Sequence, residues 1–579
     1  MITEDIRKAV DHDQTQTRDQ ARWTVMVYFA ADNDLDDEAL ANLKQIKKVG
    51  STDDVKIVAQ LDSRGAGKTF RYMLHDEETT LEEDIVGDPL PEVNTGDPRE
   101  LTNFIRWGMK DYPADHTMLV LWGHGHGWES FDNSDRAAAP TTDRVLHKDK
   151  FNGEFVDFSI GVTNRREIRP FWSSERGKEN FDKIMQSGKL PPSRYVGSFP
   201  CQSSEVVEHE KSEIGDSIGL LLDLSPGSAS ELSQDVLKMN ELSEALKNAL
   251  AGCDKSRIDI LGMDACLMGM VEVGYQVQEY VDYLVASEDT IPDESWPYDR
   301  ILQRLVKFPD ICPDEFSVTI VREYLLHYRD ESRDVAKCVC DLSQSKQLVY
   351  AIEALATELM KGLAVETDRC AILASRAMTQ TFYIRDYVDL YHFCSNLRLL
   401  SQNDQLITSC TNVMNIIRRD NGEGNKAKDN HGQDESQSSN FVHEYGYIGH
   451  RLRDANGVSI YFPCIDPSPR YADLPFAKDS LWNQFLTELA ELFPHEIQSG
   501  QDAGESSSAI GSGGDSGIKA GAGTEQKAGA GTEQKVPLPL RFRVPASRNW
   551  FPYENDEPKR ERKRRNCPDK RKKRSDNKE

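Results

Sequence analysis

Strongly apolar segments alternate with amphipathic ones along the first 290 residues of the chain. The run WTVMVYFAAD (23–32) has the continuous apolar character of a strand that is buried on both faces. The next segment, residues 33–49, begins with acidic side chains, repeats apolar positions at helical spacing and ends in lysines, as the helix dipole favours. The pattern therefore predicts a buried strand followed by a helix.

The same alternation continues as far as residue 287. We predict further strands at 55–62, 70–74, 117–123, 257–264 and 281–287. We predict further helices at 101–112, 239–250 and 265–280. Strands that alternate with helices are typical of an α/β fold, in which helices flank both faces of a mostly parallel sheet. Ligands of such sheets bind beyond the carboxyl ends of the strands, so candidate chemistry is expected there.

Changes in composition divide the chain into four parts. Residues 1–22 are polar and predicted to be disordered, and residues 23–308 form the α/β core, interrupted by a polar insertion at 129–233 that carries many Arg and Lys residues. Residues 309–493 are mainly helical. Residues 494–579 form a low-complexity linker, with AGAGTEQK repeated in tandem, and a basic tail.

The mainly helical part contains both helical and strand-like patterns. Helices are predicted near 313–328, 343–362 and 385–400, beside the strand-like runs VAKCVCDL and GVSIYFP. A polar break at 418–440 interrupts this part.

Composition and charge limit the cellular locations and the binding partners that we expect for this protein. The formal net charge is -27, although the last 21 residues hold 12 Lys or Arg against 4 Asp or Glu. An acidic body repels nucleic acid and favours cationic substrates, whereas the basic cluster at Lys559–Lys578 either binds an acidic partner or is a solvated tail. No run of about 18 apolar residues occurs, so no membrane span is predicted. The N-terminal residues lack the pattern of a secretory signal, so we predict a cytoplasmic protein whose cysteines are reduced.

Two of the predicted strands end in reactive side chains. The strand at 117–123 runs into His124 and Gly125, and the strand at 257–264 runs into Ala265 and Cys266, directly before a predicted helix. A cysteine at a helix N-terminus has a stabilised thiolate, and a histidine at the same sheet edge can exchange its proton. Each residue alone also fits a purely structural role, the cysteine as a core residue and the histidine as a turn residue.

The segments around these two residues resemble a known family. LVLWGHGHGW is similar to the histidine motif of the clostripain-like cysteine peptidases of the caspase-like clan, and GMDACLMGMVEV is similar to their cysteine motif. VMVYFAADNDLD, KMNELSEAL, ASEDTIPDESWPY, DYVDLYHFC and GVSIYFP resemble further family segments in the expected order. The resemblance covers roughly residues 23–493, outside the insertion.

The resemblance implies a caspase-like fold and cleavage on the carboxyl side of arginine or lysine. It implies that His124 is the general acid/base and Cys266 the nucleophile, with the backbone amides of Gly125 and Cys266 as oxyanion donors. The resemblance implies that no cofactor is required. Family members can depend on calcium, but this sequence does not contain the residue spacing of an EF-hand calcium-binding loop. A metal site at His124 and His126 lacks a third ligand at suitable spacing, and the pair Cys338 and Cys340 lacks a second pair for zinc.

Acidic residues near the cysteine are candidates for recognising a basic substrate side chain. Asp264 matches an acidic position of the family's specificity pocket, and its alternative role is a helix N-cap. In ASEDTIPDESWPY the second acid is Glu294, with Asp293 as the alternative, because this loop departs from the family's glycine-rich version. Trp296 either forms an apolar wall of the pocket or packs in the core.

The sequence therefore predicts a cysteine endopeptidase that acts on proteins and peptides with a basic P1 residue. Self-cleavage in the insertion is expected at a site such as Arg136, Arg144 or Arg166, unless the insertion is an inert surface feature. The alternative functions are a regulatory or binding module of the same fold with weak or lost catalysis, and an anion-binding scaffold that uses the basic tail.

Overall fold

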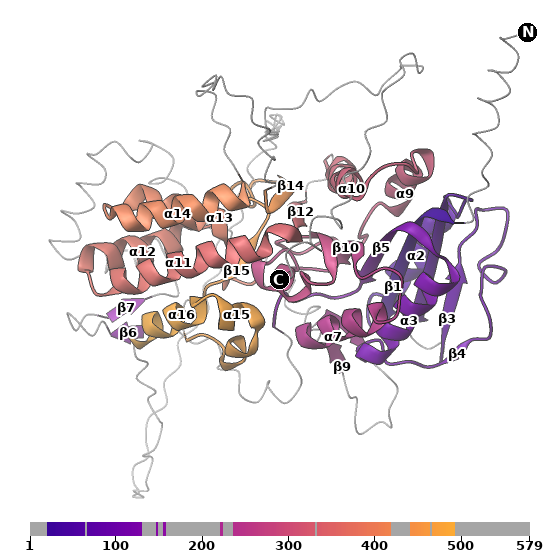
Figure 1. Cartoon of the computed structure of the whole chain (residues 1–579), viewed down its shortest axis with the longest axis horizontal. Coiled ribbons are helices and arrows are strands. Elements are labelled where there is room, and N and C mark those ends of the chain that lie inside the picture. The colour runs from indigo at the N-terminus through magenta and orange to yellow at the C-terminus, as the bar shows by residue number, and fades with distance from the viewer. Residues whose placement is uncertain are drawn as a thin grey trace, which may run out of the picture.

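A nine-stranded mixed sheet organises the part of the chain that the computed structural model describes (Figure 1). The described residues are 20–63, 67–129, 146–148, 155–157, 220–223, 235–329, 333–418, 440–463 and 466–492. Residues 1–19, most of the predicted insertion and the predicted tail at 494–579 lie outside this part, as do Arg136, Arg144 and Arg166.

The order of the strands in the main sheet is β14-β12-β11-β10-β5-β1-β2-β3-β4. Their bounds are β1 (Ala21–Ala31), β2 (Val55–Ser63), β3 (Lys68–Met73), β4 (Leu90–Pro91), β5 (Ala114–Trp122), β10 (Ile258–Asp264), β11 (Val281–Ala286), β12 (Val335–Asp341) and β14 (Val442–Ile448). The central strands β11, β10, β5, β1 and β2 are parallel to one another, and antiparallel strands complete both edges. The predicted, mostly parallel sheet is confirmed.

Short strands form three small sheets beside the main one. They pair β13 (Tyr387–Asp389) with β15 (Ser459–Tyr461), β6 (Leu146–Lys148) with β7 (Phe155–Asp157), and β8 (Leu220–Asp223) with β9 (Asp235–Leu237).

Helices cover both faces of the main sheet, as the α/β pattern predicts. One face packs against α2 (Asp36–Lys47), α9 (Tyr298–Lys307) and α10 (Pro313–Tyr328). The other packs against α3 (Pro98–Asp111), α7 (Met239–Leu250) and α8 (Val271–Val277). Strand β1 is apolar from Val25 to Ala31 because its alternate side chains enter the two cores, with Tyr28 in one and Phe29 in the other.

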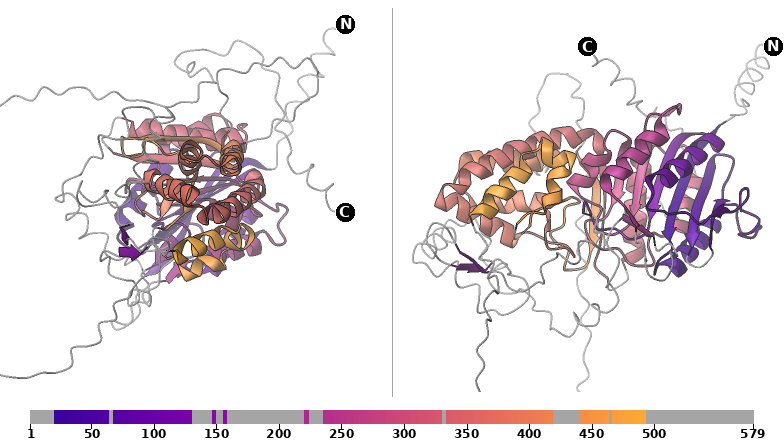
Figure 2. Two further views of the ribbon diagram at one scale, coloured as in Figure 1. Left: turned by 90° about the vertical axis from the view of Figure 1, so that its left-hand side faces the viewer. Right: turned by 90° about the horizontal axis from the view of Figure 1, so that it is seen from below.

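The C-terminal part adds a group of helices beside the sheet (Figure 2). It comprises α11 (Ser345–Leu363), α12 (Glu366–Met378), α13 (Leu390–Leu400), α14 (Asp404–Ile417), α15 (Pro475–Asp479) and α16 (Trp482–Glu491), with the 3-10 turns η1 (Leu342–Gln344) and η2 (Pro469–Asp473). The same part of the chain contributes β12 and β14 to the main sheet. Within the described residues, no helix combines the length and the apolarity needed to cross a bilayer.

One predicted helix begins later than the pattern indicates. The helix predicted at 265–280 begins at Val271, and residues 265–270 instead run beside the loop that follows β11. The amide of Leu267 donates to the carbonyl of Asp289 at 3.1 Å, and that of Gly269 donates to Ser287 at 2.7 Å. Leu267 has a φ of 65°, which no α-helix accommodates. These backbone bonds outweigh the apolar periodicity of the segment.

Candidate active site

His124 and Cys266 follow the ends of two neighbouring parallel strands. In the register of β5 and β10, Trp122 lies opposite Asp264, so each reactive residue stands two positions beyond a paired residue. The amide of Gly123 donates to the carbonyl of Asp264 at 3.2 Å, which extends the contact between the two strand ends. Both residues therefore leave the sheet at the same edge, the one where α/β sheets bind ligands.

Gly125 lies directly against the backbone of Cys266. A Cβ atom at residue 125 would stand 2.4 Å from the carbonyl oxygen of Cys266 and 2.9 Å from its nitrogen, so only glycine fits this approach. Within the described residues, neither amide donates a backbone hydrogen bond. Two amide groups close to the thiol are thus left for an oxyanion.

Asp34 binds the imidazole of His124, and the sequence analysis did not identify it. The Nε2 atom of His124 lies 2.7 Å from Oδ1 of Asp34, in the turn between β1 and α2. A hydrogen bond that a ring N–H donates to a carboxylate fixes the orientation and the tautomer of a histidine, and it stabilises the protonated ring. The signal in the sequence was the position of Asp34 just after β1, which adjoins β5.

The thiol of Cys266 lies in a half-buried site beneath the loop that follows β11. Its Sγ atom accepts a hydrogen bond from the amide of Ile291 at 3.3 Å. Burial raises the pKa of Cys266 to about 11; the nearby carboxylates of Asp289 and Asp293 also raise it, while the Ile291 amide and Lys337 lower it. The prediction of a helix N-terminus that stabilises the thiolate is therefore wrong, because α8 begins five residues later.

Asp264 is a buried carboxyl group at the end of β10. Its Oδ2 atom accepts hydrogen bonds from the hydroxyls of Ser295 and Tyr298, the latter at 2.7 Å. Its Oδ1 atom is buried and has no hydrogen-bond partner among the described residues. Burial raises the pKa of Asp264, although these hydrogen bonds and the charge of Lys337 act in the opposite direction. The alternative role as a helix N-cap is excluded, since no helix begins beside it.

The two alternative acids of the 287–297 loop have different surroundings. The carboxylate of Glu294 is held by the guanidinium of Arg333, with one of the two contacts at 2.8 Å. This ion pair lowers the pKa of Glu294. Asp293 is exposed, and within the described residues no ion pair or hydrogen bond engages its carboxylate, which nevertheless raises the pKa of Cys266. Of the two, Asp293 is the carboxylate that a cationic ligand meets without a competing partner.

A buried lysine beside Asp264 is the second residue that the sequence analysis missed. Lys337, on β12, is 1% exposed, and its Nζ atom lies 4.3 Å from the ring centre of Tyr324 and 4.9 Å from that of Trp296. Trp296 is fully buried and packs on the backbone of Gly262, as the core-packing alternative predicts. The signal in the sequence was a lysine among the apolar residues of the strand-like run VAKCVC.

Comparison with known proteins identifies the family. A profile of the clostripain family matches residues 27–158 and 230–488, more than half of the chain. The chain belongs to the clostripain family of peptidases. Clostripain from Hathewaya histolytica is 37% identical over 76 residues, which span 12% of this chain and only 13% of that relative.

Solved structures of clostripain-family peptidases also resemble the chain. A secreted C11 cysteine protease from Bacteroides thetaiotaomicron, in complex with an irreversible peptide inhibitor, is 16% identical with a TM-score of 0.46, covering 80% of this chain and 99% of the other. An inactive zymogen C11 protease from Parabacteroides distasonis is 17% identical with a TM-score of 0.43, covering 80% and 98%.

This comparison corrects one prediction from the sequence. The predicted cytoplasmic location is contradicted, because a C11 cysteine protease among these solved structures is described as secreted.

Among the residues placed in the structure, metal-binding side chains do not gather at the candidate site of this clostripain-family chain. The described residues contain no group of three or more His, Cys, Asp or Glu side chains arranged to hold a metal ion. Burial lowers the pKa of His126 to about 4, and its carbonyl accepts a hydrogen bond from the hydroxyl of Tyr387 at 2.7 Å. His126 thus connects the histidine loop with β13.

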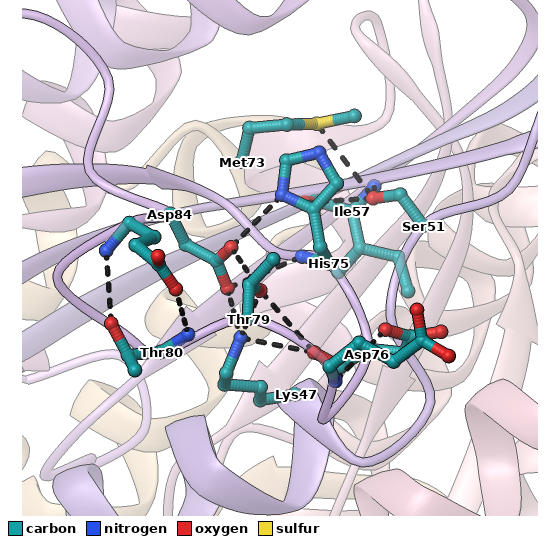
Figure 3. Close-up of polar contacts among 11 residues, drawn as sticks. Lys47, Ser51, Ile57, Met73, His75, Asp76, Thr79, Thr80 and Asp84 are labelled. Carbon is teal, nitrogen blue, oxygen red and sulfur yellow. Dashed lines mark hydrogen bonds and ion pairs between the residues drawn. The ribbon is translucent and has the colours of Figure 1, made fainter.

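Figure 3 shows a second polar cluster, around Asp84 in the segment after β3. Asp84 accepts hydrogen bonds from Lys47 at 2.6 Å, His75 at 2.9 Å and Thr79 at 2.8 Å. Lys47 ends α2, and His75 and Asp84 lie in the segment after β3, near the start of β2. This cluster joins α2 to the loop and is separate from the candidate active site.

Proposed function

We propose that the chain is a cysteine endopeptidase that hydrolyses peptide bonds on the carboxyl side of arginine or lysine, with Cys266 as nucleophile and His124 as general acid/base. The observation that carries this proposal is the shared register of β5 and β10, which brings both residues out at one edge of the sheet. Membership of the clostripain family supports the same chemistry.

The proposed reaction is acyl transfer through a thioester. Cys266 passes its proton to His124 and its sulfur attacks the scissile carbonyl carbon, while the amides of Gly125 and Cys266 donate to the oxyanion. His124 then protonates the leaving amine as the carbon–nitrogen bond breaks. A water molecule, deprotonated by His124, attacks the thioester and releases the acid and the thiol.

The hydrogen bond between His124 and Asp34 favours this proton transfer. With Nε2 bound to Asp34, Nδ1 is the nitrogen that exchanges the proton. The pKa of the Cys266 thiol, raised to about 11, means that the resting residue is a thiol at neutral pH. We therefore infer a mechanism in which His124 removes the proton during the attack, instead of one that begins from a standing thiolate.

Recognition of a basic P1 side chain is assigned to the acids beside Cys266. Asp293 presents an exposed carboxylate, whereas Glu294 is paired with Arg333 and Asp264 is buried. We therefore infer that Asp293, more than Glu294, meets the cation, with Asp264 deeper in the pocket. The acidic body, with a net charge of -27 for the whole chain, attracts cationic peptides as well.

An assay with peptides that end in a fluorogenic P1 arginine tests this function. Cleavage is expected in the wild type and is expected to be lost in Cys266→Ala and His124→Ala. Cys253→Ala serves as the matched control, because Cys253 is also half-buried but lies in the loop before β10. Cleavage that survives in Cys266→Ala contradicts the proposal. No turnover with or without calcium favours the alternative of a catalytically weak or inactive binding module.

Self-processing within the insertion belongs to the same proposal. Arg136, Arg144 and Arg166 lie in the insertion, and cleavage after any of them would match the proposed preference for arginine at P1. Intact-mass measurement of the purified wild type beside Cys266→Ala decides this: we expect fragments only in the wild type. Two intact chains that differ by the substitution alone exclude self-processing.

The basic tail is proposed to bind an acidic partner. Residues 559–579 combine 12 Lys or Arg with 4 Asp or Glu, a charge density that attracts polyanions. Binding to immobilised heparin that weakens with salt and disappears on removal of residues 559–579 is the expected result. Equal retention of the full and the shortened chains contradicts it.

A further inference from the structure

Four buried polar atoms without hydrogen-bond partners surround the region behind Cys266. Within the described residues they are Oδ1 of Asp264, Nε1 of Trp296, OH of Tyr324 and Nζ of Lys337. Buried polar groups are nearly always hydrogen-bonded, since an unpaired one costs free energy. A group of four in one place indicates a buried polar cluster that packing alone does not explain.

The sheet register places the two charged members of this group in one row. Trp122 pairs with Asp264 across β5 and β10, and Gly262 pairs with Val285 across β10 and β11. Val285 in turn pairs with Val339 across β11 and β12. Asp264 lies two positions after Gly262, and Lys337 lies two positions before Val339 on the antiparallel strand β12. Both side chains therefore lie in one row across the sheet, on the same face. Two strand spacings, about 10 Å between backbones, separate them, and a lysine side chain spans most of that distance.

Lys337 and Asp264 therefore act on each other through a medium of low polarity. Burial lowers the pKa of Lys337 to about 8, while the attraction of Asp264 opposes this effect. The flat faces of Tyr324 and Trp296 hold the ammonium group from two directions. A cationic side chain of a substrate would make the same contacts if it lay beside Asp264.

We propose that Lys337 is a specificity-determining residue of the peptidase, whose ammonium group occupies the cationic position beside Asp264 and competes with a basic P1 side chain. The inference rests on the proposed function and deepens it. A P1 arginine or lysine then gains little from Asp264 and depends on Asp293, at the exposed part of the loop.

This assignment predicts how the charge preference changes when Lys337 is removed. Replacement by methionine keeps the length and the apolar stem of the side chain and leaves Asp264 without its internal cation. A guanidinium or ammonium group of the substrate then supplies the missing charge. A merely structural lysine would alter stability and would leave the preference for charge at P1 unchanged.

The test compares matched peptides that differ only in the charge at P1: arginine against citrulline, and lysine against norleucine. In Lys337→Met we expect the ratio of kcat/KM for arginine over citrulline to rise about tenfold, equivalent to roughly 1.4 kcal/mol. In the double variant Lys337→Met with Asp264→Asn the rise is expected to vanish. An unchanged ratio in a folded Lys337→Met protein overturns the inference, while the proposed peptidase function stands.

A binding measurement separates this inference from the catalytic proposal. Agmatine carries a guanidinium group and no scissile bond, so calorimetric titration of Cys266→Ala with agmatine reports the pocket even if no peptide is cleaved. We expect binding about tenfold tighter when Lys337→Met is added to Cys266→Ala. Equal affinities in the two proteins refute the role of Lys337.

Two further variants control for charge and folding. Lys110→Met removes an exposed lysine from the end of α3, on the opposite face of the sheet, and is expected to leave the P1 ratio unchanged. If Lys337→Met does not fold, Lys337→Gln takes its place, because its amide can bond to the unpartnered groups of Tyr324 and Asp264. A rise in the P1 ratio that also occurs in Lys110→Met overturns the inference.

Discussion

The Nε2 atom of His124 lies 2.7 Å from Oδ1 of Asp34. This contact joins the turn after β1 to the end of β5, two strands that pair along their length. Asp34 thereby takes the position that the third residue of a nucleophile–histidine–carboxylate system takes: it orients the base and supports its positive charge. In the proposed mechanism Asp34 is a positioning residue, because it acts on the substrate only through His124.

Asp34→Asn tests this relationship. We expect kcat/KM to fall about tenfold to a hundredfold, since the amide supports the protonated ring poorly, a smaller loss than that of the base itself. Asp37→Asn, an exposed aspartate of the same region, should leave kcat/KM unchanged. Wild-type kcat/KM in Asp34→Asn would contradict a role of Asp34 through His124.

Gly125→Ala tests the close approach of the two backbones. The new Cβ atom would stand 2.4 Å from the carbonyl oxygen of Cys266, so the loop must move and take its amide with it. We expect kcat to fall about a hundredfold or more, as for the loss of an oxyanion donor, with a small change in Tm. Gly274→Ala is the control, because the atoms nearest to its Cβ are the ends of side chains, with Leu342 the closest at 3.2 Å. Activity close to wild type in Gly125→Ala would argue against this oxyanion site.

Asp84→Asn tests the polar cluster in the segment after β3. Burial raises the pKa of Asp84, but the hydrogen bonds from Lys47, His75 and Thr79 outweigh it and leave the pKa below its usual 3.8. The carboxylate therefore stabilises the fold above pH 3.8, and this stability is lost as the pH falls through the lowered pKa. The variant should lose about 3–5 kcal/mol at neutral pH, since it breaks a buried pair.

Denaturant unfolding at neutral and acidic pH checks the Asp84 prediction. The difference between the variant and the wild type should shrink at acidic pH, while kcat/KM per folded molecule stays the same at neutral pH. A difference that does not depend on pH would contradict the ionised form of Asp84.

Glu272→Gln tests a buried acid on α8. Burial raises the pKa of Glu272 to about 7 from 4.5, against hydrogen bonds from the amide of Tyr461 and the hydroxyl of Tyr471. Between these two pH values the folded protein retains a proton that the unfolded chain has released, so stability falls as the pH rises from 4.5 to 7. The loss is on the order of 3 kcal/mol.

Comparison of unfolding free energies at pH 4.5 and pH 8 checks this prediction. Glu272→Gln keeps an oxygen that accepts both hydrogen bonds but cannot ionise, so its stability relative to the wild type should be greater at pH 8. Glu279→Gln, an exposed site after the same helix, should show no such dependence. Equal differences at both pH values would contradict the raised pKa.

The sheet and the proposed dyad were accessible to sequence analysis because both depend on regular patterns. Continuous apolar runs mark strands that are covered on both faces, and parallel strands present their carboxyl ends at one edge. His124 and Cys266 directly follow such runs, so their common edge followed from the pattern. The start of α8 was not accessible in this way, since the backbone bonds of Leu267 and Gly269 to the next loop override helical periodicity.

The residues that the sequence analysis missed act through contacts between distant segments. Asp34 occurs among several acids at a helix start, and only the pairing of β1 with β5 selects it as the partner of His124. Lys337 stands in a strand 73 positions after Asp264, with β11 between their strands. The charge of Lys337 at a buried strand position could be recognised in the sequence. Its proximity to Asp264 could be known only from the order of the strands in the sheet.

Active-site labelling tests the central claim most directly. The wild-type protein is treated with an irreversible acyloxymethyl ketone peptide that carries a P1 arginine, and the modified residue is located by mass spectrometry of its peptides. We predict a single adduct on Cys266, at a rate that falls about a hundredfold in His124→Ala. Labelling of another cysteine, or labelling of Cys266 at the same rate without His124, would contradict the account.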